Sequence, residues 1–196
     1  MKDLVASFTT HVNEGLRIAE GIKFTGSRDF DHIIITGLGG SGIGGTIVSQ
    51  WVASSATKPI IVNKNYNLPN IVGKKSLVIV CSYSGNTEET LEALEIALEK
   101  KAQIFAISSG GKLIDLAREK GFDFIQIPGG LPPRAAIGYS ITQLSTLLES
   151  LGMCDYITKD EFLAAEDIIN NQLNNIKTVA KEVAILKSCF SNRTRS

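Results

Sequence analysis

The sequence predicts an α/β fold in which five parallel strands form one sheet between two layers of helices. Short apolar runs rich in β-branched residues alternate with helical patterns, as in right-handed strand–helix–strand units. The runs are apolar nearly throughout, which is typical of strands buried on both faces of a parallel sheet. We predict the strand order 2-1-3-4-5, in which the chain reverses direction between strands one and three.

The order of elements follows from the same patterns. The apolar runs give the expected strands, at residues 32–36, 59–63, 76–81, 103–108 and 122–127. The helical patterns give the expected helices, at residues 2–21, 44–54, 87–101, 112–120, 135–151 and 159–187. We expect one domain at residues 1–155. Residues 156–196 would then hold the last helix and a polar tail that leads into a second domain.

Composition narrows the class of protein. The 196 residues are 43% hydrophobic and 20% charged, which suits one globular domain with a full core. The formal net charge is zero and no basic block is present, so we expect no nucleic-acid partner. The three cysteines lack metal-ligand spacing, and Cys81 lies in an apolar run, where we expect a core thiol. This use of cysteine fits a reducing compartment. No signal peptide and no stretch of roughly 20 apolar residues is present, so we expect a cytoplasmic protein without membrane contact.

The most informative segment is the turn between the third strand and the helix after it, with the sequence CSYSGNTEET at residues 81–90. Ser82, Ser84 and Thr87 place three hydroxyls around this turn, and Gly85 lets the backbone approach a ligand closely. The helix behind the turn adds free N–H groups and the positive end of its dipole. Together these groups suit a dianionic phosphate without a metal or a lysine.

Simple helix capping is the alternative explanation of the same turn. Thr87 or Asn86 would cap the helix, and Glu89 or Thr90 would close a capping box. Capping explains one or two of these residues, but not three hydroxyls together with a glycine. We therefore favour the phosphate site.

A second candidate is the glycine-rich stretch after the first strand, where glycine fills six of the nine positions at residues 37–45. Its start satisfies G-x-G-x-x-G, but no carboxylate ends the second strand, as a dinucleotide site would require. No lysine precedes Thr46, so a P-loop also fails. A close strand–helix crossing needs fewer glycines. We favour close approach of the backbone to a ligand, with Ser41 adding a hydroxyl at the sheet's switch point.

A third candidate is Arg134, which follows Pro132 and Pro133 near the start of a helix. Arginine suits bidentate contact with an oxyanion, and the prolines stiffen its approach. A surface arginine in a solvated loop explains the same residues equally well.

These three stretches together resemble the sugar isomerase (SIS) domain. The turn at residues 82–90 alone indicates only an SIS domain. The glycine stretch and the Pro-Pro-Arg loop resemble, more narrowly, the bifunctional phosphoglucose/phosphomannose isomerases of archaea and bacteria, over nearly the whole chain up to residue 187. The resemblance implies a flavodoxin-like αβα sandwich.

The resemblance also implies an activity. Members of this family interconvert glucose 6-phosphate or mannose 6-phosphate with fructose 6-phosphate through a cis-enediol(ate), without a metal or another cofactor. It implies that five residues bind the substrate: Ser82, Ser84 and Thr87 at the phosphate, Gly40 and Ser41 along the sugar. It places Arg134 near C1 and C2, where it would act as a catalytic residue by stabilising the negative charge of the intermediate.

The sequence also departs from this family, whose members are longer and carry a second SIS domain. That domain supplies a glutamate base, a ring-opening histidine contributed across a homodimer, and a lysine. Nothing here matches these residues, and we expect His11 and His32 to be structural. We therefore expect the first, phosphate-binding domain of a larger isomerase, cut or frameshifted, that is inactive alone. If it were active, a carboxylate such as Glu88 would have to be the base.

Two other functions fit parts of the sequence. A lone SIS domain could sense a sugar phosphate and regulate a partner, because sensing needs no general base. An oxidoreductase could bind NAD at the glycine stretch, but the missing acidic residue and the clustered hydroxyls argue against it.

Overall fold

The structure is a computed structural model. It describes residues 7–154 continuously, and then residues 161–162, 164–165, 167–169, 171–172, 175 and 178. The chain divides into two compact units, Met1–Ile157 and Thr158–Ser196. The described residues of the second unit are helical. The rest of the expected last helix, the polar tail and the expected division at residue 155 lie outside the described residues.

The first unit contains a five-stranded parallel sheet in the order β2-β1-β3-β4-β5, which confirms the predicted order. Its strands are β1 (His32–Thr36), β2 (Ile60–Asn63), β3 (Ser76–Cys81), β4 (Gln103–Ser108) and β5 (Asp123–Gln126). All six residues of the central strand β3 are buried, whereas the edge strands β2 and β5 are mostly half-buried.

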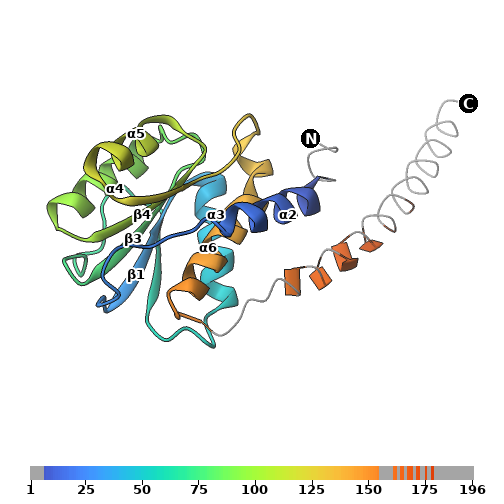
Figure 1. Cartoon of the computed structure of the whole chain (residues 1–196), viewed down its shortest axis with the longest axis horizontal. Helices are drawn as coiled ribbons and strands as arrows, with labels where there is room; N and C mark the ends of the chain where they lie inside the picture. Colours follow the sequence, from blue (N-terminus) through green and yellow to red (C-terminus); the bar gives the residue numbers. More distant parts are fainter. Residues whose placement is uncertain are drawn as a thin grey trace, which may run out of the picture. The chain divides into compact units, whose positions relative to one another are not determined.

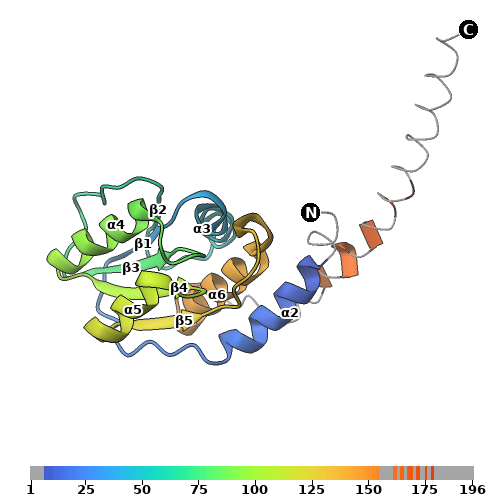
Figure 2. The same ribbon diagram turned by 90° about the horizontal axis from the view of Figure 1, so that it is seen from above.

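Helices cover both faces of the sheet. They are α2 (Phe8–Ala19), α3 (Gly39–Trp51), α4 (Glu88–Glu99), α5 (Gly111–Lys120) and α6 (Ile137–Ser150), with a 3₁₀ helix η1 (Pro133–Ala135) before α6. Figures 1 and 2 show α4 and α5 on one face, and α3 and α6 on the other, with α2 against α6. No helix in the described part of the chain is long and apolar enough to cross a membrane.

One core lies between the sheet and the α4–α5 layer. It is built from apolar side chains of the strands and of the two helices, among them Ile34, Val78, Val80, Ile104, Ala93, Leu94 and Leu113. Alternate residues of the same strands face the opposite layer, as the two-residue period of a strand requires. Burial on both faces explains why the strands read as continuous apolar runs.

The glycine stretch differs from its prediction. The loop expected at residues 37–45 is short, because α3 begins at Gly39 instead of residue 44. The helix ends at Trp51 instead of residue 54. A β-carbon on Gly45 would lie 2.8 Å from Ile35 Cγ2, and one on Gly44 would lie 2.9 Å from Ser140 Cβ. Glycine therefore lets α3 lie close to both the sheet and α6. This packing offsets the penalty of about 1 kcal/mol that each glycine brings to a helix.

Candidate functional site

The candidate site lies at the carboxyl edge of the sheet, where β1 and β3 are neighbours and the strand order reverses. Thr36 ends β1 and pairs with Val80, next to the last residue of β3. The two segments that follow these strands, the start of α3 and the turn at residues 82–87, therefore meet at one place. Ligands of open α/β sheets bind at such a switch point.

Two of the three predicted hydroxyls in the turn face each other. Ser82 Oγ lies 3.0 Å from Thr87 Oγ1, and Ser82 is only 2% exposed. The Gly85 N–H donates to Ser82 Oγ at 3.1 Å, which fixes this side chain from the other side. Ser84 is exposed, and its Oγ accepts a hydrogen bond from Asn86 N at 3.3 Å. The turn thus presents one fixed pair of hydroxyls and one exposed hydroxyl.

The capping alternative is wrong for α4. Thr87 occupies the N-cap position, but its side chain makes no capping hydrogen bond and pairs with Ser82 instead. Asn86 does cap a helix, but a different one: its Oδ1 accepts from Lys112 N, in α5, at 3.1 Å. The first N–H groups of α4 therefore have no capping side chain and stay available to an anion.

Gly85 is required by the fold, whatever its role towards a ligand. Its φ of +70° is in the left-handed region, and a β-carbon there would collide with Gly110 O. Its carbonyl accepts from Leu113 N, in α5, at 3.0 Å. The turn is thus held against the start of α5, which makes it a rigid platform.

Ser41 joins α3, which contains the glycine stretch, to this turn. It lies in the first turn of α3, is 7% exposed, and its Oγ accepts a hydrogen bond from Tyr83 N at 3.1 Å. The predicted hydroxyl is therefore beside the turn. Because Ser41 Oγ is the acceptor in this bond, its O–H can still donate to another group.

Gly40 joins the same helix to the Pro-Pro-Arg segment. A β-carbon on Gly40 would lie 2.7 Å from Pro133 O and 3.4 Å from Arg134 N. Arg134 is exposed, and it makes no ion pair with any residue in the described part of the chain. The structure thus brings all three predicted segments together, while the roles of their residues towards a ligand stay predictions.

Two residues near the site were missed by the sequence reasoning. Tyr83 is 8% exposed and makes hydrogen bonds to several segments, which are described below. Lys64, just after β2, places its Cε 3.6 Å from where a β-carbon of Gly42 would lie. An aromatic residue between two serines was the available signal for Tyr83, and the position after a strand was the signal for Lys64.

Both histidines have structural contacts. His32 Nε2 lies 2.8 Å from Ser76 Oγ, at the amino edge of the sheet away from the site. His11 is buried on α2 and stacks on Tyr139 with 5.2 Å between ring centroids. Within the described residues, no group of three or more His, Cys, Asp or Glu side chains could hold a metal ion.

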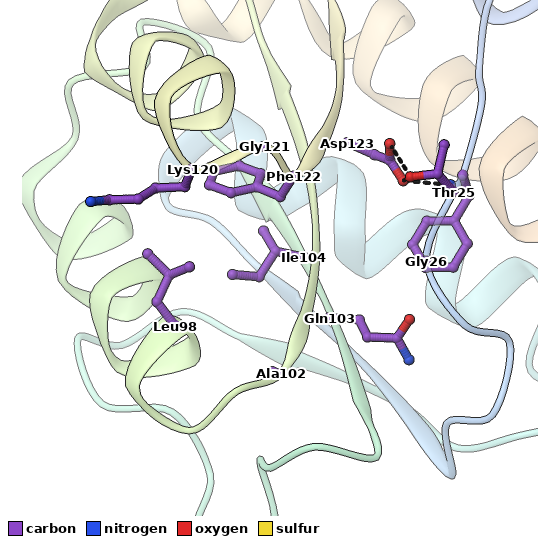
Figure 3. Close-up of a pocket in the computed structure, with 11 residues that line it drawn as sticks. Thr25, Gly26, Leu98, Ala102, Gln103, Ile104, Lys120, Gly121, Phe122 and Asp123 are labelled. Carbon is purple, nitrogen blue, oxygen red and sulfur yellow. Dashed lines mark hydrogen bonds between the residues drawn. The ribbon is translucent and has the colours of Figure 1, made fainter.

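A cavity of about 230 Å³ lies at the opposite edge of the sheet (Figure 3), where β4 and β5 begin and α4 and α5 end. Asp123 closes one side of it by accepting hydrogen bonds from Thr25 N at 2.6 Å and from Thr25 Oγ1 at 2.9 Å. The predicted site residues do not line this cavity. It is therefore separate from the candidate site.

Comparison with known proteins identifies the class. The family model described as the SIS domain matches residues 28–125, which include β1 to β4, all but the last residue of β5, and the turn at residues 82–87. The chain belongs to the SIS domain family, as predicted.

Two curated proteins are similar to this chain in sequence. The chain is 49% identical over 141 residues to the bifunctional phosphoglucose/phosphomannose isomerase of Caldicellulosiruptor bescii, with 72% of this chain and 41% of that protein covered. It is 39% identical over 156 residues to the protein of the same name from Aquifex aeolicus, with 79% and 47% covered. The chain thus spans less than half the length of these relatives.

Solved structures share the fold. The C-terminal domain of glucosamine-fructose-6-phosphate aminotransferase from Francisella tularensis superposes with a TM-score of 0.61 at 19% identity, over 86% of this chain and 51% of that one. The Vibrio vulnificus NanR protein complexed with ManNAc-6P superposes with a TM-score of 0.52 at 17% identity, over 90% and 67%. At these identities the likeness concerns the fold.

Proposed function

We propose that this chain is the phosphosugar-binding half of an aldose–ketose isomerase that interconverts glucose 6-phosphate or mannose 6-phosphate with fructose 6-phosphate. The observation that carries the proposal is the Ser82–Thr87 hydroxyl pair beside the uncapped first turn of α4. Membership of the SIS family and the names of the curated relatives support the same substrate class.

The phosphate of the substrate binds at the turn. Ser84 donates its O–H to a phosphate oxygen, and so does one hydroxyl of the Ser82–Thr87 pair, while the proton of the other hydroxyl holds the pair together. The first N–H groups of α4 point to the same anion. A hydrogen bond to a charged group contributes about 1.5–3 kcal/mol, so the phosphate supplies most of the affinity. Neutral sugars lack this anchor and should bind far more weakly.

The sugar lies between the turn and Arg134, along Gly40 and Ser41. In the isomerisation, a base takes the proton from C2 of the aldose, and its electron pair forms the C1–C2 double bond of a cis-enediol(ate). The proton then returns to C1, and a second proton passes from the C2 hydroxyl to the C1 oxygen, which gives the ketose. Negative charge develops on the oxygens at C1 and C2. The exposed guanidinium of Arg134, which forms no ion pair with a described residue, is suited to stabilise it.

We propose that a second SIS domain supplies the general base and the ring-opening acid, as the family resemblance implies. The full-length protein would then be a homodimer, which light scattering on that protein would test. General base catalysis is typically worth roughly 10²–10⁴-fold, so the 196-residue chain should bind substrate without turning it over.

Calorimetric titration of this chain with fructose 6-phosphate, and with fructose as the matched neutral ligand, tests the proposal. We expect measurable binding of the phosphate ester alone, weakened by about 1–2 kcal/mol in Ser84→Ala. Equal affinity for both ligands would contradict the proposed site. Robust isomerisation by the chain would show instead that it contains its own base, and Glu88→Gln would then identify or exclude Glu88.

A further inference from the structure

Tyr83 lies inside the candidate turn and makes hydrogen bonds to three other segments. Its N–H donates to Ser41 Oγ, in α3, at 3.1 Å. Its carbonyl accepts from Ser109 N at 3.0 Å and from Ser109 Oγ at 2.6 Å, after β4. Its hydroxyl donates to Pro128 O at 3.1 Å and accepts from Leu131 N at 2.9 Å, after β5.

The hydroxyl of Tyr83 anchors a loop that has little other support. Residues 128–131 contain two exposed glycines, and Gly130 has a φ of +86°. Among the described residues, the two hydrogen bonds of the Tyr83 hydroxyl are those that connect this loop to the rest of the molecule. Without the hydroxyl, the half-buried Pro128 carbonyl and Leu131 N–H would each lose their partner.

The loop leads directly to Arg134 through a stiff connection. Pro132 and Pro133 follow Leu131, and each proline ring fixes its own φ. At the far end, the Pro133 carbonyl packs against Gly40. The path of the chain into Arg134 is therefore set by the Tyr83 hydroxyl before the prolines and by Gly40 after them.

We propose that Tyr83 is a positioning residue whose hydroxyl directs Arg134 towards the reacting end of the sugar. This inference rests on the proposed function. Because Tyr83 stands between Ser82 and Ser84, one residue then fixes the distance between the phosphate anchor and the arginine. The hydroxyl acts on Arg134 alone, and the backbone of Tyr83 serves the phosphate turn.

Tyr83→Phe separates these two roles, because it keeps the ring and the backbone hydrogen bonds. Two probes report on the 196-residue chain by calorimetry: inorganic phosphate, and a sugar-phosphate hydroxamate whose planar anionic end resembles the enediolate. We expect hydroxamate affinity to fall about tenfold, the worth of one well-placed hydrogen bond to a charged group, and phosphate affinity to stay unchanged. Ser109→Ala is the matched control, because it removes a hydroxyl bonded to the Tyr83 carbonyl and leaves the loop anchored.

A double-mutant cycle then tests whether the effect passes through Arg134. If the hydroxyl acts only through Arg134, Arg134→Ala should weaken hydroxamate binding about tenfold less in the Tyr83→Phe background than in the wild-type background. Additive effects would overturn the inference, as would an equal loss of phosphate affinity in Tyr83→Phe. Failure of the wild-type chain to bind either probe would overturn the proposed function, which is a distinguishable result.

Amide hydrogen exchange at Leu131 gives a readout that needs no ligand. Its N–H bonds to the Tyr83 hydroxyl, so exchange should become faster in Tyr83→Phe and stay unchanged in Ser109→Ala. Unchanged exchange in Tyr83→Phe would overturn the inference. If that variant folds poorly, Pro132→Gly at an exposed position loosens the same connection and should cause the same selective loss of hydroxamate affinity.

Discussion

Ser84 and Thr87 belong to one turn but have different surroundings. Ser84 is exposed, and its hydroxyl accepts one local hydrogen bond from Asn86 N. Thr87 is half-buried, and its hydroxyl faces Ser82. Neither side chain caps α4. We therefore expect each hydroxyl to contribute more to a bound phosphate than to the stability of the fold.

We expect Ser84→Ala and Thr87→Val each to weaken phosphosugar binding by about 1–2 kcal/mol. Melting temperatures should change little, because no cap is lost. Thr87→Ser, which restores the hydroxyl, is the matched control and should bind like the wild type. Calorimetric titration and thermal melting measure the two effects. A drop in stability of ~1 kcal/mol without a change in binding would identify Thr87 as a cap after all.

Arg134→Ala should affect catalysis more than substrate binding in the full-length isomerase. Its charge is needed most when the enediolate forms, so kcat should fall much more than KM rises. Arg134→Lys keeps the charge but loses the planar fork, and should give an intermediate kcat. Steady-state kinetics would decide: a rise in KM alone would make Arg134 a ground-state phosphate clamp.

At the scale of elements, the start of α3 links the turn at residues 82–87 to η1. Its amino end touches the Pro133 backbone through Gly40 and the turn through Ser41. Backbone atoms cannot move aside as a flexible side chain can. The position of this helix therefore controls the spacing between the turn and Arg134.

Gly40→Ala tests this contact. The new β-carbon would lie 2.7 Å from Pro133 O, so we expect overpacking to destabilise the chain by about 1–3 kcal/mol and to displace Arg134. Gly73→Ala is the matched control, because a β-carbon there meets nothing within 4 Å and its φ is not left-handed. Chemical denaturation gives the stability. Equal stability of both variants would show that α3 shifts freely.

Some elements could be predicted from sequence because their signals are local. The bounds of β1, β3 and β4 agree with the apolar runs, since turn residues flank each run. The start of α3 could not be predicted, because glycine disfavours helices locally and the packing of Gly44 and Gly45 against Ser140 and Ile35 appears only in the fold. The capping of α5 by Asn86 and the hydroxyl contacts of Tyr83 join segments distant in sequence, so no local pattern indicated them.

At the scale of the whole molecule, Cys81 ends the central strand and is 2% exposed. Burial raises the pKa of the Cys81 thiol from 9.0 to about 12. The folded state therefore holds this proton over a pH range in which the unfolded state has lost it. The thiol acts as an apolar core group, as its place in the sequence predicted.

Stability should therefore fall as pH rises from 9.0 towards about 12, because ionisation of Cys81 favours the unfolded chain in that window. Cys81→Ala removes this contribution, and its stability should decline less over the same range. Denaturant titrations at several pH values measure both. In the native chain at pH 8, Cys81 should resist alkylation, and rapid labelling detected by mass spectrometry would contradict its burial.

The interlocking of the turn with α5 has a consequence for how such sequences diverge. Gly85 and Asn86 hold α5 in place, so selection for folding alone would retain them in a descendant that no longer meets a phosphosugar. Ser84 makes no such contact with α5, so it could be substituted without loss of the fold once a phosphosugar is no longer bound. A homologous sequence that keeps the glycine and the asparagine but replaces this serine is therefore expected to preserve the architecture after its original role has been lost.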